Sequence, residues 1–382
     1  MIESIRFENF KALRTVESKL ERLTVFVGPN GCGKTSVLQG LECVSKCNRG
    51  TKLVDAFSAE MSLEDVYTKS ANGPLRIQCS TRRECAMLLA DRNPADGCSD
   101  NLGSSNPGWF AGYSRIPARE TDVNGTRSLE KDELYDYRSI RLTLNQRQMA
   151  LPSYSDSLNP QIESDGAGLA SAVANLKLSD MDRFQSLEAA MRRIIPTIER
   201  IGIRKSRVWR NGSMGQYQQG AEIRENFESR QYTGEQLFFD FAHAKGVPAT
   251  HASEGTLNVL ALLTALYSPS APRHLLLDDL EQSLHPAAQR TFVELLREVL
   301  EEFPDLQILA TAHSPYLLDC LRPDEVRVMS LNEAGDAVCD SLTNHPEFER
   351  WKDEMAPGEL WSLFGERWIH QNGKITASSR AS

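Results

Sequence analysis

Several features that mark other classes of protein are missing from this 382-residue sequence. No apolar run approaches the roughly 18 residues that suggest a membrane span, and the N-terminus lacks the charged and then apolar segments of a secretory signal. The eight cysteines form no CxxC pair, which argues against zinc and disulfides and favours reduced, structural thiols. No apolar heptad runs long enough for a coiled coil. We therefore expect a cytoplasmic protein that does not contact a membrane.

The composition is that of a folded globular protein. Hydrophobic residues make up 40% of the chain and charged residues 25%, so the chain can bury a large core. The length suits two or three packed units or one elaborated α/β domain. A net charge of -9 argues against a protein that coats nucleic acid generally. Because charges are screened over about 8 Å at physiological salt, a local basic face can still act on its own.

Apolar periodicity divides the chain into a split core and an insertion. The first forty or so residues predict two strands, a glycine-rich loop and a helix. From residue 253 onward helices and strands alternate, which predicts an α/β fold with a mostly parallel sheet flanked by helices. Between these parts, residues 93–132 are rich in Gly, Ser and Asn and predict a long surface loop. Two amphipathic helices, the second capped by Asp180, and further strands follow.

Residues 28–35, GPNGCGKT, follow the apolar run LTVFV and match the pattern G-x-x-x-x-G-K-[ST]. In such a phosphate loop, glycines let backbone N–H groups converge on phosphate oxygens and the lysine reaches the β and γ phosphates. The hydroxyl of Thr35 would ligate Mg²⁺, and the helix that follows adds the positive end of its dipole. Cys32 is either a small loop residue or a thiol open to oxidation. The expected phosphate-binding residues are Asn30, Gly31, Cys32, Gly33, Lys34, Thr35 and Ser36.

Acidic residues follow an apolar strand far downstream, in HLLLDDLEQSLHP. A phosphate loop needs a carboxylate at the end of a neighbouring strand to hold Mg²⁺ through water, and Asp278 fits this role. Asp279 stands where a base that orients the attacking water would lie, with Glu281 as the competing candidate. One strand later, ATAHS places His313 where an imidazole can hydrogen-bond the γ phosphate or the water. The alternative is that the acids only cap the next helix and the histidine is structural.

The segment HASEGTLNVLALLTALY places Ser253, Glu254 and Gly255 at the start of an apolar helix. Ser253 is expected to cap this helix, and the exposed N–H groups of its first turn can bind an anion. A helix cap alone would explain these three residues, so a further role for them depends on the other motifs.

Taken in order, these four elements resemble the ATP-binding-cassette ATPases of the SMC-like branch, and most closely the prokaryotic AAA-family ATPases related to the OLD (overcoming lysogenization defect) proteins. The motifs that carry the resemblance are GPNGCGKTS, SEGTLNVLALLTAL, LLLDDLEQSLHP and ILATAHSPYLLD. The resemblance implies an ABC-type P-loop NTPase fold with an N-terminal antiparallel β subdomain and a helical insertion, and ATP and Mg²⁺ as cofactors. It also implies that Ser253 and Gly255 contact the γ phosphate bound to a second protomer, in a head-to-tail homodimer or higher oligomer.

The same resemblance assigns a role to each part of the chain. Residues 1–92 would form the N-terminal part of the ATPase core with the phosphate loop (Walker A), and residues 93–245 the insertion. Residues 246–345 would form the C-terminal part of the core, with the signature motif, the Walker B acids and the H-loop histidine. Residues 346–382 would form a C-terminal tail.

Two departures from these relatives shape the functional hypothesis. Many relatives have Glu at the position of Asp279, and the shorter side chain puts the rate of hydrolysis in question. The OLD proteins also carry a C-terminal TOPRIM nuclease domain, whereas too few residues follow His313 for an ordinary domain of about 100 residues. We therefore expect an ATPase sensor or switch that controls a partner effector, a nuclease or toxin encoded nearby, in anti-phage defence.

Two other functions stay open: a DNA-repair ATPase that acts directly on DNA, and a nucleotide-dependent scaffold that does not hydrolyse ATP. Basic residues near the end of the insertion's helices form either a nucleic-acid face or only a solvated surface. Apolar residues of the tail form either a docking surface or the packing of a terminal helix. The basic residues are Arg192, Arg193, Arg200, Arg204, Lys205, Arg207 and Arg210. The tail residues are Trp351, Leu360, Trp361, Leu363, Phe364 and Trp368.

Overall fold

The fold is described from a computed structural model. It covers residues 1–57, 63–69, 71–82, 84–91, 110–117, 137–213, 217–219, 222–224, 227–269, 272–282 and 284–370. The chain divides into two compact units. Unit 1 consists of Met1–Arg141, Pro272–Gln282 and Phe292–Ser382, and unit 2 consists of Leu142–Ala271 and Ser283–Thr291.

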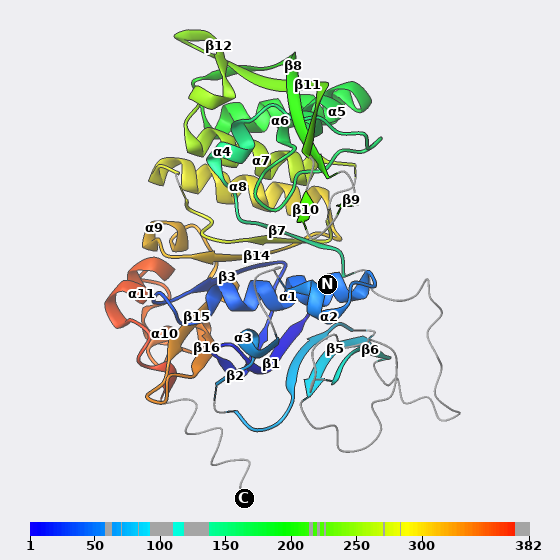
Figure 1. Cartoon of the computed structure of the whole chain (residues 1–382). Helices are drawn as coiled ribbons and strands as arrows, with labels where there is room; N and C mark the ends of the chain where they lie inside the picture. Colours follow the sequence, from blue (N-terminus) through cyan, green and yellow to red (C-terminus); the bar gives the residue numbers. More distant parts are fainter. Residues whose placement is uncertain are drawn as a thin grey trace, which may run out of the picture. The chain divides into compact units, whose positions relative to one another are not determined.

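The core of unit 1 is a six-stranded sheet in the order β16-β15-β3-β14-β13-β7 (Figure 1). Strand β14 (Gln307–Ala312) pairs in parallel with β3 (Leu23–Val27) on one side and with β13 (His274–Leu277) on the other. Every residue of these three strands is buried, as expected for parallel strands that are covered on both faces. The carboxyl ends of the three strands consequently lie along one edge of the sheet.

A second sheet of unit 1 is antiparallel, in the order β2-β1-β4-β5-β6. Helix α1 (Lys34–Asn48) packs between the two sheets, because Val37 and Leu41 on its apolar face share one core with residues of both. Gly40 approaches the second sheet so closely that a Cβ there would lie 2.3 Å from the ring of Phe7. The helix that follows the glycine-rich loop is therefore held on two sides.

The other elements of unit 1 are mostly short. They are β1 (Ser4–Phe10), β2 (Leu13–Lys19), α2 (Leu53–Ala56), α3 (Leu63–Val66), β4 (Leu75–Ser80), β5 (Glu84–Asp91), β6 (Phe110–Pro117), β7 (Ser139–Leu142), α9 (Pro315–Leu318), η3 (Pro323–Glu325), β15 (Val326–Leu331), β16 (Ala337–Ser341), η4 (Leu342–Asn344), α10 (Phe348–Trp351) and α11 (Pro357–Phe364). Helix α8 (Pro286–Glu302) contributes residues to both units.

Unit 2 combines helices with a three-stranded antiparallel sheet in the order β12-β11-β8. Strands β8 (Ile198–Ser213) and β11 (Phe227–Phe241) pair over almost their whole length and form a long ribbon. The two amphipathic helices predicted from the sequence are α5 (Leu169–Ser179) and α6 (Met181–Ile194). Asp180 caps α6 by accepting a backbone N–H of its first turn at 3.1 Å, so the predicted cap is confirmed.

The remaining described elements of unit 2 are short, apart from one long helix. They are α4 (Gln146–Ala150), β9 (Tyr217–Gln219), β10 (Glu222–Arg224), β12 (Ala244–Pro248), η2 (Ala249–His251) and α7 (Glu254–Tyr267).

The expected fold class is confirmed, with a mostly parallel core sheet, an N-terminal antiparallel sheet and a helical insertion. The loop expected over residues 93–132 is wrong at residues 110–117. These form β6, which pairs with β5 along its whole length, and this partner strand outweighs the weak strand propensity of a Gly- and Ser-containing segment. The rest of 93–132 lies outside the described residues.

Two smaller expectations can also be compared with the structure. The seven described cysteines are all free thiols, as expected, and Cys98 lies outside the described residues. Among the helices in the described part of the chain, none has both the length and the apolar character required to cross a membrane.

Gln307, at the start of β14, fastens the N-terminus of the chain to the core sheet. Its fully buried side-chain amide accepts a hydrogen bond from the backbone N–H of Ile2 at 3.0 Å. The same amide donates to the carbonyl oxygens of Ile2 and Glu21, both at 2.9 Å. The oxygen and the nitrogen of this buried amide thus both have hydrogen-bond partners. Through them β14 is anchored to two distant backbone segments.

The C-terminal segment, which is part of unit 1, buries two of the six predicted tail residues and leaves three of them half-buried. Leu360 is 1% exposed and Trp368 is 7% exposed. The ring of His345 lies 4.7 Å from that of Phe364 and 5.0 Å from that of Trp368. Leu363 alone among the exposed large hydrophobic residues belongs to this described segment. Packing within unit 1 therefore accounts for Leu360 and Trp368 and in part for Trp351, Trp361 and Phe364.

Helix α11 begins directly against α9. The carboxylate oxygen Oδ1 of Asp319 accepts hydrogen bonds from the backbone N–H groups of Gly358 at 2.8 Å and Glu359 at 3.3 Å. A Cβ at Gly358 would lie 2.0 Å from the carbonyl oxygen of Pro315. Only glycine permits this approach of the two backbones.

We predict that Gly358→Ala lowers the free energy of unfolding by about 1–3 kcal/mol, because the added methyl group forces α11 away from α9. Gly202→Ala is the matched control, since a Cβ there would make only ordinary contacts at 3.6 Å. Urea unfolding followed by circular dichroism measures both variants. Equal midpoints for the two variants would contradict the close packing at Gly358.

Candidate nucleotide-binding and hydrolysis site

Three polar segments meet at the carboxyl edge of the core sheet. The phosphate loop follows β3, Asp278 and Asp279 follow β13, and His313 follows β14. Because β14 pairs in parallel with both other strands, the three segments leave the sheet side by side. Ligands of open α/β sheets bind at this edge, outside the carboxyl ends of the strands.

Two glycines of the phosphate loop adopt backbone conformations that favour glycine. Gly28 and Gly33 have φ angles of 145° and 99°, which residues with a side chain rarely adopt. A Cβ at Gly28 would also lie 2.1 Å from the carbonyl oxygen of Met329. Helix α1 begins at Lys34 with no side-chain cap and no acidic residue in its first turn. Its N-terminal N–H groups and dipole therefore favour an anion such as phosphate.

Lys34 closes the phosphate loop on itself. Its ammonium group donates hydrogen bonds to the carbonyl oxygens of Gly28 at 2.8 Å and Pro29 at 2.9 Å, and the side chain is buried. Burial lowers the pKa of Lys34, while Cys32 and the acidic residues Asp279, Glu281 and Glu366 act in the opposite direction. The negative charges that stabilise the ammonium group thus come from the site itself.

The other residues of the phosphate loop differ in exposure. Asn30, Gly31 and Thr35 are exposed, and Ser36 is partly exposed. Cys32 is 1% exposed, and burial raises the pKa of its thiol. A buried thiol held in its neutral form is a poor nucleophile, so the small-residue role of Cys32 is favoured over sensitivity to oxidation.

The residues present fit a magnesium ion that is shared with phosphates. Mg²⁺ prefers oxygen ligands and commonly takes only one or two from the protein, the others being water and phosphate. The Thr35 hydroxyl and the Asp278 carboxylate supply such oxygens. Among the described residues no group of three or more His, Cys, Asp or Glu side chains is placed to hold a metal ion without a nucleotide.

Asp279 adopts a left-handed backbone conformation, with φ of 51°. This conformation is uncommon for residues other than glycine, although Asp tolerates it better than most. Thr311 of β14 holds it in place, because its hydroxyl accepts the N–H of Asp279 at 2.8 Å and its carbonyl accepts the N–H of Leu280 at 2.9 Å. The turn exposes the carboxylate of Asp279, whose side chain is 53% exposed.

His313 and Glu281 complete this cluster in different ways. The imidazole Nε2 of His313 lies 3.5 Å from Oδ1 of Asp279. Glu281 instead accepts the backbone N–H of His313, while its second oxygen is buried and has no hydrogen-bond partner among the described residues. Burial raises the pKa of Glu281, and the hydrogen bond from His313 partly offsets this effect. Of the two candidate bases, Asp279 is the accessible one and Glu281 is engaged in holding the end of β14.

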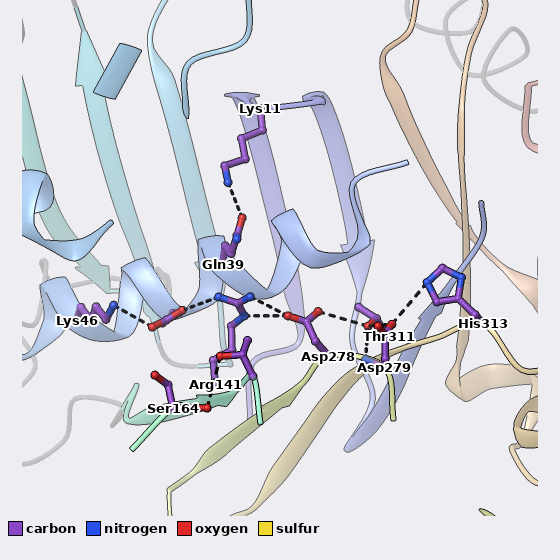
Figure 2. Close-up of polar contacts among 11 residues, drawn as sticks. Lys11, Gln39, Lys46, Arg141, Ser164, Asp278, Asp279, Thr311 and His313 are labelled. Atoms are coloured by element: carbon purple, nitrogen blue, oxygen red, sulfur yellow. Dashed lines mark hydrogen bonds and ion pairs between the residues drawn. The ribbon is translucent and has the colours of Figure 1, made fainter. Parts of the chain in front are cut away.

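A line of polar contacts runs from α1 to His313 (Figure 2). In it the guanidinium of Arg141, on β7, donates from Nη2 and Nε to Oδ2 of Asp278 at 2.7 and 3.1 Å. The hydroxyl of Thr311 lies 3.4 Å from Oδ1 of both Asp278 and Asp279. The sequence motifs indicated neither Arg141 nor Thr311, because both reach the site only through strand pairing. Glu366, which acts electrostatically on Lys34, was also missed, because it lies beyond α11, far from the motifs in the sequence.

The three predicted signature residues lie in unit 2, at the start of α7. The hydroxyl of Ser253 accepts the backbone N–H of Thr256 at 3.3 Å, which makes Ser253 the cap of the helix as predicted. Ser253 is exposed, Glu254 is partly exposed and Gly255 is buried. The exposed serine and the first turn of this 14-residue helix form a surface that can approach an anion.

The seven predicted basic residues are unequal in their partners. Arg192 pairs with Glu188 at 3.0 Å and Lys205 pairs with Glu235 at 2.7 Å. The exposed residues Arg200, Arg204 and Arg207 of β8 make no ion pair with any carboxylate of the described residues. Arg204 lies over the ring of Phe238 at 4.1 Å. Arg193 lies on α6, and the side chain of Arg210 is outside the described residues.

Two curated proteins are similar to this chain in sequence. The chain is 31% identical over 90 residues to the Septu protein PtuA of Bacillus thuringiensis. The aligned segment covers 23% of this chain and 22% of the relative. The chain is 20% identical over 352 residues to the Septu protein PtuA of Bacillus mycoides, which covers 88% of this chain and 41% of the relative. The chain thus spans less than half the length of these curated relatives.

A solved structure shares the fold. The SMC head bound to the C-terminal winged-helix domain of ScpA superposes with a TM-score of 0.52 and 12% sequence identity, over 89% of this chain and 97% of that structure. At this level of identity the likeness concerns the fold alone. It confirms the ABC-type P-loop architecture that the motifs led us to expect.

Two families of AAA ATPase domains match the chain. Residues 1–102 match the family described as "AAA ATPase domain". Residues 113–319, more than half of the chain, match the family described as "AAA domain, putative AbiEii toxin, Type IV TA system". The phosphate loop, the acids after β13 and His313 all fall within these two matches. The chain therefore belongs to the latter family of AAA domains.

Proposed function

We propose that this protein binds and hydrolyses ATP as a dimeric switch that controls a partner effector, a nuclease or toxin, in anti-phage defence. The observation that carries the proposal is the meeting of the phosphate loop, Asp279 and His313 at one edge of the core sheet. The family match and the similarity to the Septu proteins support it.

In this proposal the phosphate loop and Asp278 bind ATP together with Mg²⁺. Lys34 would exchange its two carbonyl partners for the β and γ phosphates, which accept hydrogen bonds more strongly because they are charged. Thr35 and Asp278 would hold Mg²⁺, which neutralises charge on the phosphates. The uncapped start of α1 would bind the remaining phosphate oxygens.

Asp279 and His313 are the proposed catalytic residues, and Glu281 the residue that positions them. An exposed carboxylate in a fixed turn can orient a water molecule for attack on the γ phosphate. His313, 3.5 Å from this carboxylate, can hydrogen-bond the same water or the phosphate. Glu281 is occupied by the backbone of His313 and is partly buried, so its proposed role is to keep β14 in register with the acids.

The proposed dimer places the start of α7 of one protomer against the phosphates bound by the other. Ser253 and the N–H groups near Gly255 would then contact the γ phosphate, and Glu254 would lie beside them. ATP would join the two protomers, in a head-to-tail dimer or a higher oligomer, and hydrolysis would release them. A partner effector could respond to this change if it binds the dimer and the separate protomers with different affinities.

Contact with nucleic acid is a second candidate function, and it rests on the β8–β11 ribbon. A two-stranded ribbon fits the major groove of DNA. Arg200, Arg204 and Arg207 lack carboxylate partners among the described residues, and Trp209 is 64% exposed. Unpaired arginines bind phosphates, and an exposed indole can stack on a base. This function would suit either a switch triggered by phage DNA or an ATPase that acts on DNA directly.

We expect Asp279→Asn to lower the ATP turnover number by about 100-fold or more while ATP binding is kept, because the amide cannot orient water as a base. Glu281→Gln should keep most of the turnover, since its amide oxygen can still accept the N–H of His313. Turnover is measured by phosphate release and binding by a fluorescent ATP analogue. Equal losses in both variants would contradict the assignment of Asp279, and no turnover in the wild type would favour the scaffold.

Ser253→Arg is expected to abolish ATP-dependent dimers without weakening ATP binding to the monomer, because a large cation would fill the space for the γ phosphate. Ser268→Arg is the matched control, since Ser268 lies at the opposite end of α7. Both variants also carry Asp279→Asn, so that bound ATP is not hydrolysed. Light scattering then measures the molar mass of each protein with ATP. Dimers of Ser253→Arg as abundant as those of the control would remove the signature role.

Arg200→Glu with Arg207→Glu should weaken binding of a labelled 20-base-pair DNA by at least about tenfold and flatten its salt dependence, because each contact to a phosphate releases a counterion. Arg290→Glu, another exposed arginine of unit 2 without an acidic partner among the described residues, is the control. Fluorescence anisotropy at two salt concentrations measures the three proteins. An unchanged affinity in the double variant would exclude the ribbon as the DNA-binding element.

A further inference from the structure

Arg141 occupies the carboxylate that the proposed function assigns to Mg²⁺. Two of its N–H groups donate to the same oxygen, Oδ2 of Asp278, at 2.7 and 3.1 Å. Both side chains are 16% exposed, so water screens their interaction less than it would at the surface. Of the two oxygens of Asp278, only Oδ1 is left for a metal-bound water, and it faces the hydroxyl of Thr311 at 3.4 Å.

The same guanidinium also has a second carboxylate within reach. Its Nη1 donates to Glu42 of α1 at 3.3 Å, a longer contact than those to Asp278. The other oxygen of Glu42 pairs with Lys46, one turn along the same helix, at 2.8 Å. Figure 2 shows this line of contacts continuing from Lys46 past Arg141 to Asp278. Arg141 is therefore shared between an acid on the helix that follows the phosphate loop and the acid at the metal position.

This sharing has a direct electrostatic consequence for a metal ion. Mg²⁺ carries two positive charges, and it would have to approach a carboxylate whose charge is already shared with a guanidinium. Repulsion between the two cations disfavours the metal when no nucleotide is present. The phosphates of ATP bring negative charge to the same place, which offsets the repulsion and lets the metal bind.

We propose that Arg141 is a positioning residue that makes Mg²⁺ binding at Asp278 conditional on ATP. Before the nucleotide arrives, Arg141 fixes the side chain of Asp278 and balances its charge. When Mg²⁺ and ATP bind together, Arg141 moves toward Glu42, which already accepts one of its N–H groups. This inference rests on the proposed function, because it requires Asp278 to be the metal-holding acid.

The direction of the effect separates this role from a merely structural one. Loss of a structural contact would loosen Asp278 and weaken metal binding. Loss of a competing cation should instead strengthen metal binding in the absence of nucleotide, because Asp278 and Glu42 are then left as two carboxylates without their shared counter-charge.

The test is a titration of the full chain with Mn²⁺, whose free form is counted by electron paramagnetic resonance, with and without a non-hydrolysable ATP analogue. The wild type should bind Mn²⁺ tightly only with the analogue. Arg141→Gln should bind Mn²⁺ without the analogue at least tenfold more tightly than the wild type. Lys46→Gln, which removes a positive charge bonded to Glu42 and not to Asp278, should differ from the wild type by less than twofold.

A second variant covers the case in which Arg141→Gln does not fold, as judged by circular dichroism. In Glu42→Gln, Arg141 loses the carboxylate of residue 42 and keeps that of Asp278. Arg141 should then leave Asp278 less readily, so the dissociation constant for Mn²⁺ with the analogue should rise at least threefold. Unchanged or tighter binding in Glu42→Gln, or unchanged or weaker nucleotide-free binding in Arg141→Gln, would overturn the proposal.

Asp278→Asn distinguishes failure of this inference from failure of the proposed function. If Asp278→Asn leaves Mn²⁺ binding with the analogue intact, the metal role of Asp278 is wrong and both fall. If Asp278→Asn abolishes that binding while Arg141→Gln behaves as the wild type, only the role of Arg141 is wrong.

Discussion

The parallel pairing of β14 with β3 and β13 is the constraint on which the candidate site depends. It brings together three segments that are separated by up to 285 residues in the sequence, since Gly28 and His313 follow two adjacent strands. A shift of one residue in the pairing of β14 would turn Thr311 away from the backbone of Asp279. The left-handed turn at Asp279, which Thr311 supports, would then lose its hydrogen-bond acceptor.

Most of the charged groups at this edge already have partners within the chain. Lys34 is bonded to carbonyl oxygens of its own loop, Asp278 to Arg141, and Glu281 to the backbone of His313. These contacts give each of the three groups a partner without a ligand, although Oε2 of Glu281 has none among the described residues. They also mean that a nucleotide must replace existing hydrogen bonds, so its affinity reflects a difference between two sets of contacts. Asp279 also has partners, the Thr311 hydroxyl at 3.4 Å and Nε2 of His313 at 3.5 Å, but its carboxylate stays half exposed.

Features that depend on local sequence could be predicted well, whereas features that depend on pairing between distant segments could not. A signal within a few residues marks each of the locally determined features. These are the glycines and Lys34 of the phosphate loop, the caps Asp180 and Ser253, and the apolar strands before Asp278 and His313. Arg141 leaves none, because it lies 137 residues from Asp278 and reads as an ordinary polar residue of a short strand. Strand β6 was missed since its partner β5, not its composition, makes it a strand. The roles of the site residues remain proposals.

The anchoring of β14 has a consequence for the order in which the protein can fold during synthesis. At its first residue the strand is bonded to the backbone of Ile2 through Gln307. Three residues past its last residue begins α9, against which Gly358 of α11 packs. Ile2 precedes its partner Gln307 by 305 residues, so this contact forms only after β14 has been made. Domains generally form as units while the chain emerges. Since β3 lies between β14 and β15 in the core sheet, the edge that carries His313 is completed only after residues 307–331 have been made. Until then β3 lacks a neighbour on at least one side, and its buried residues must be protected by other means.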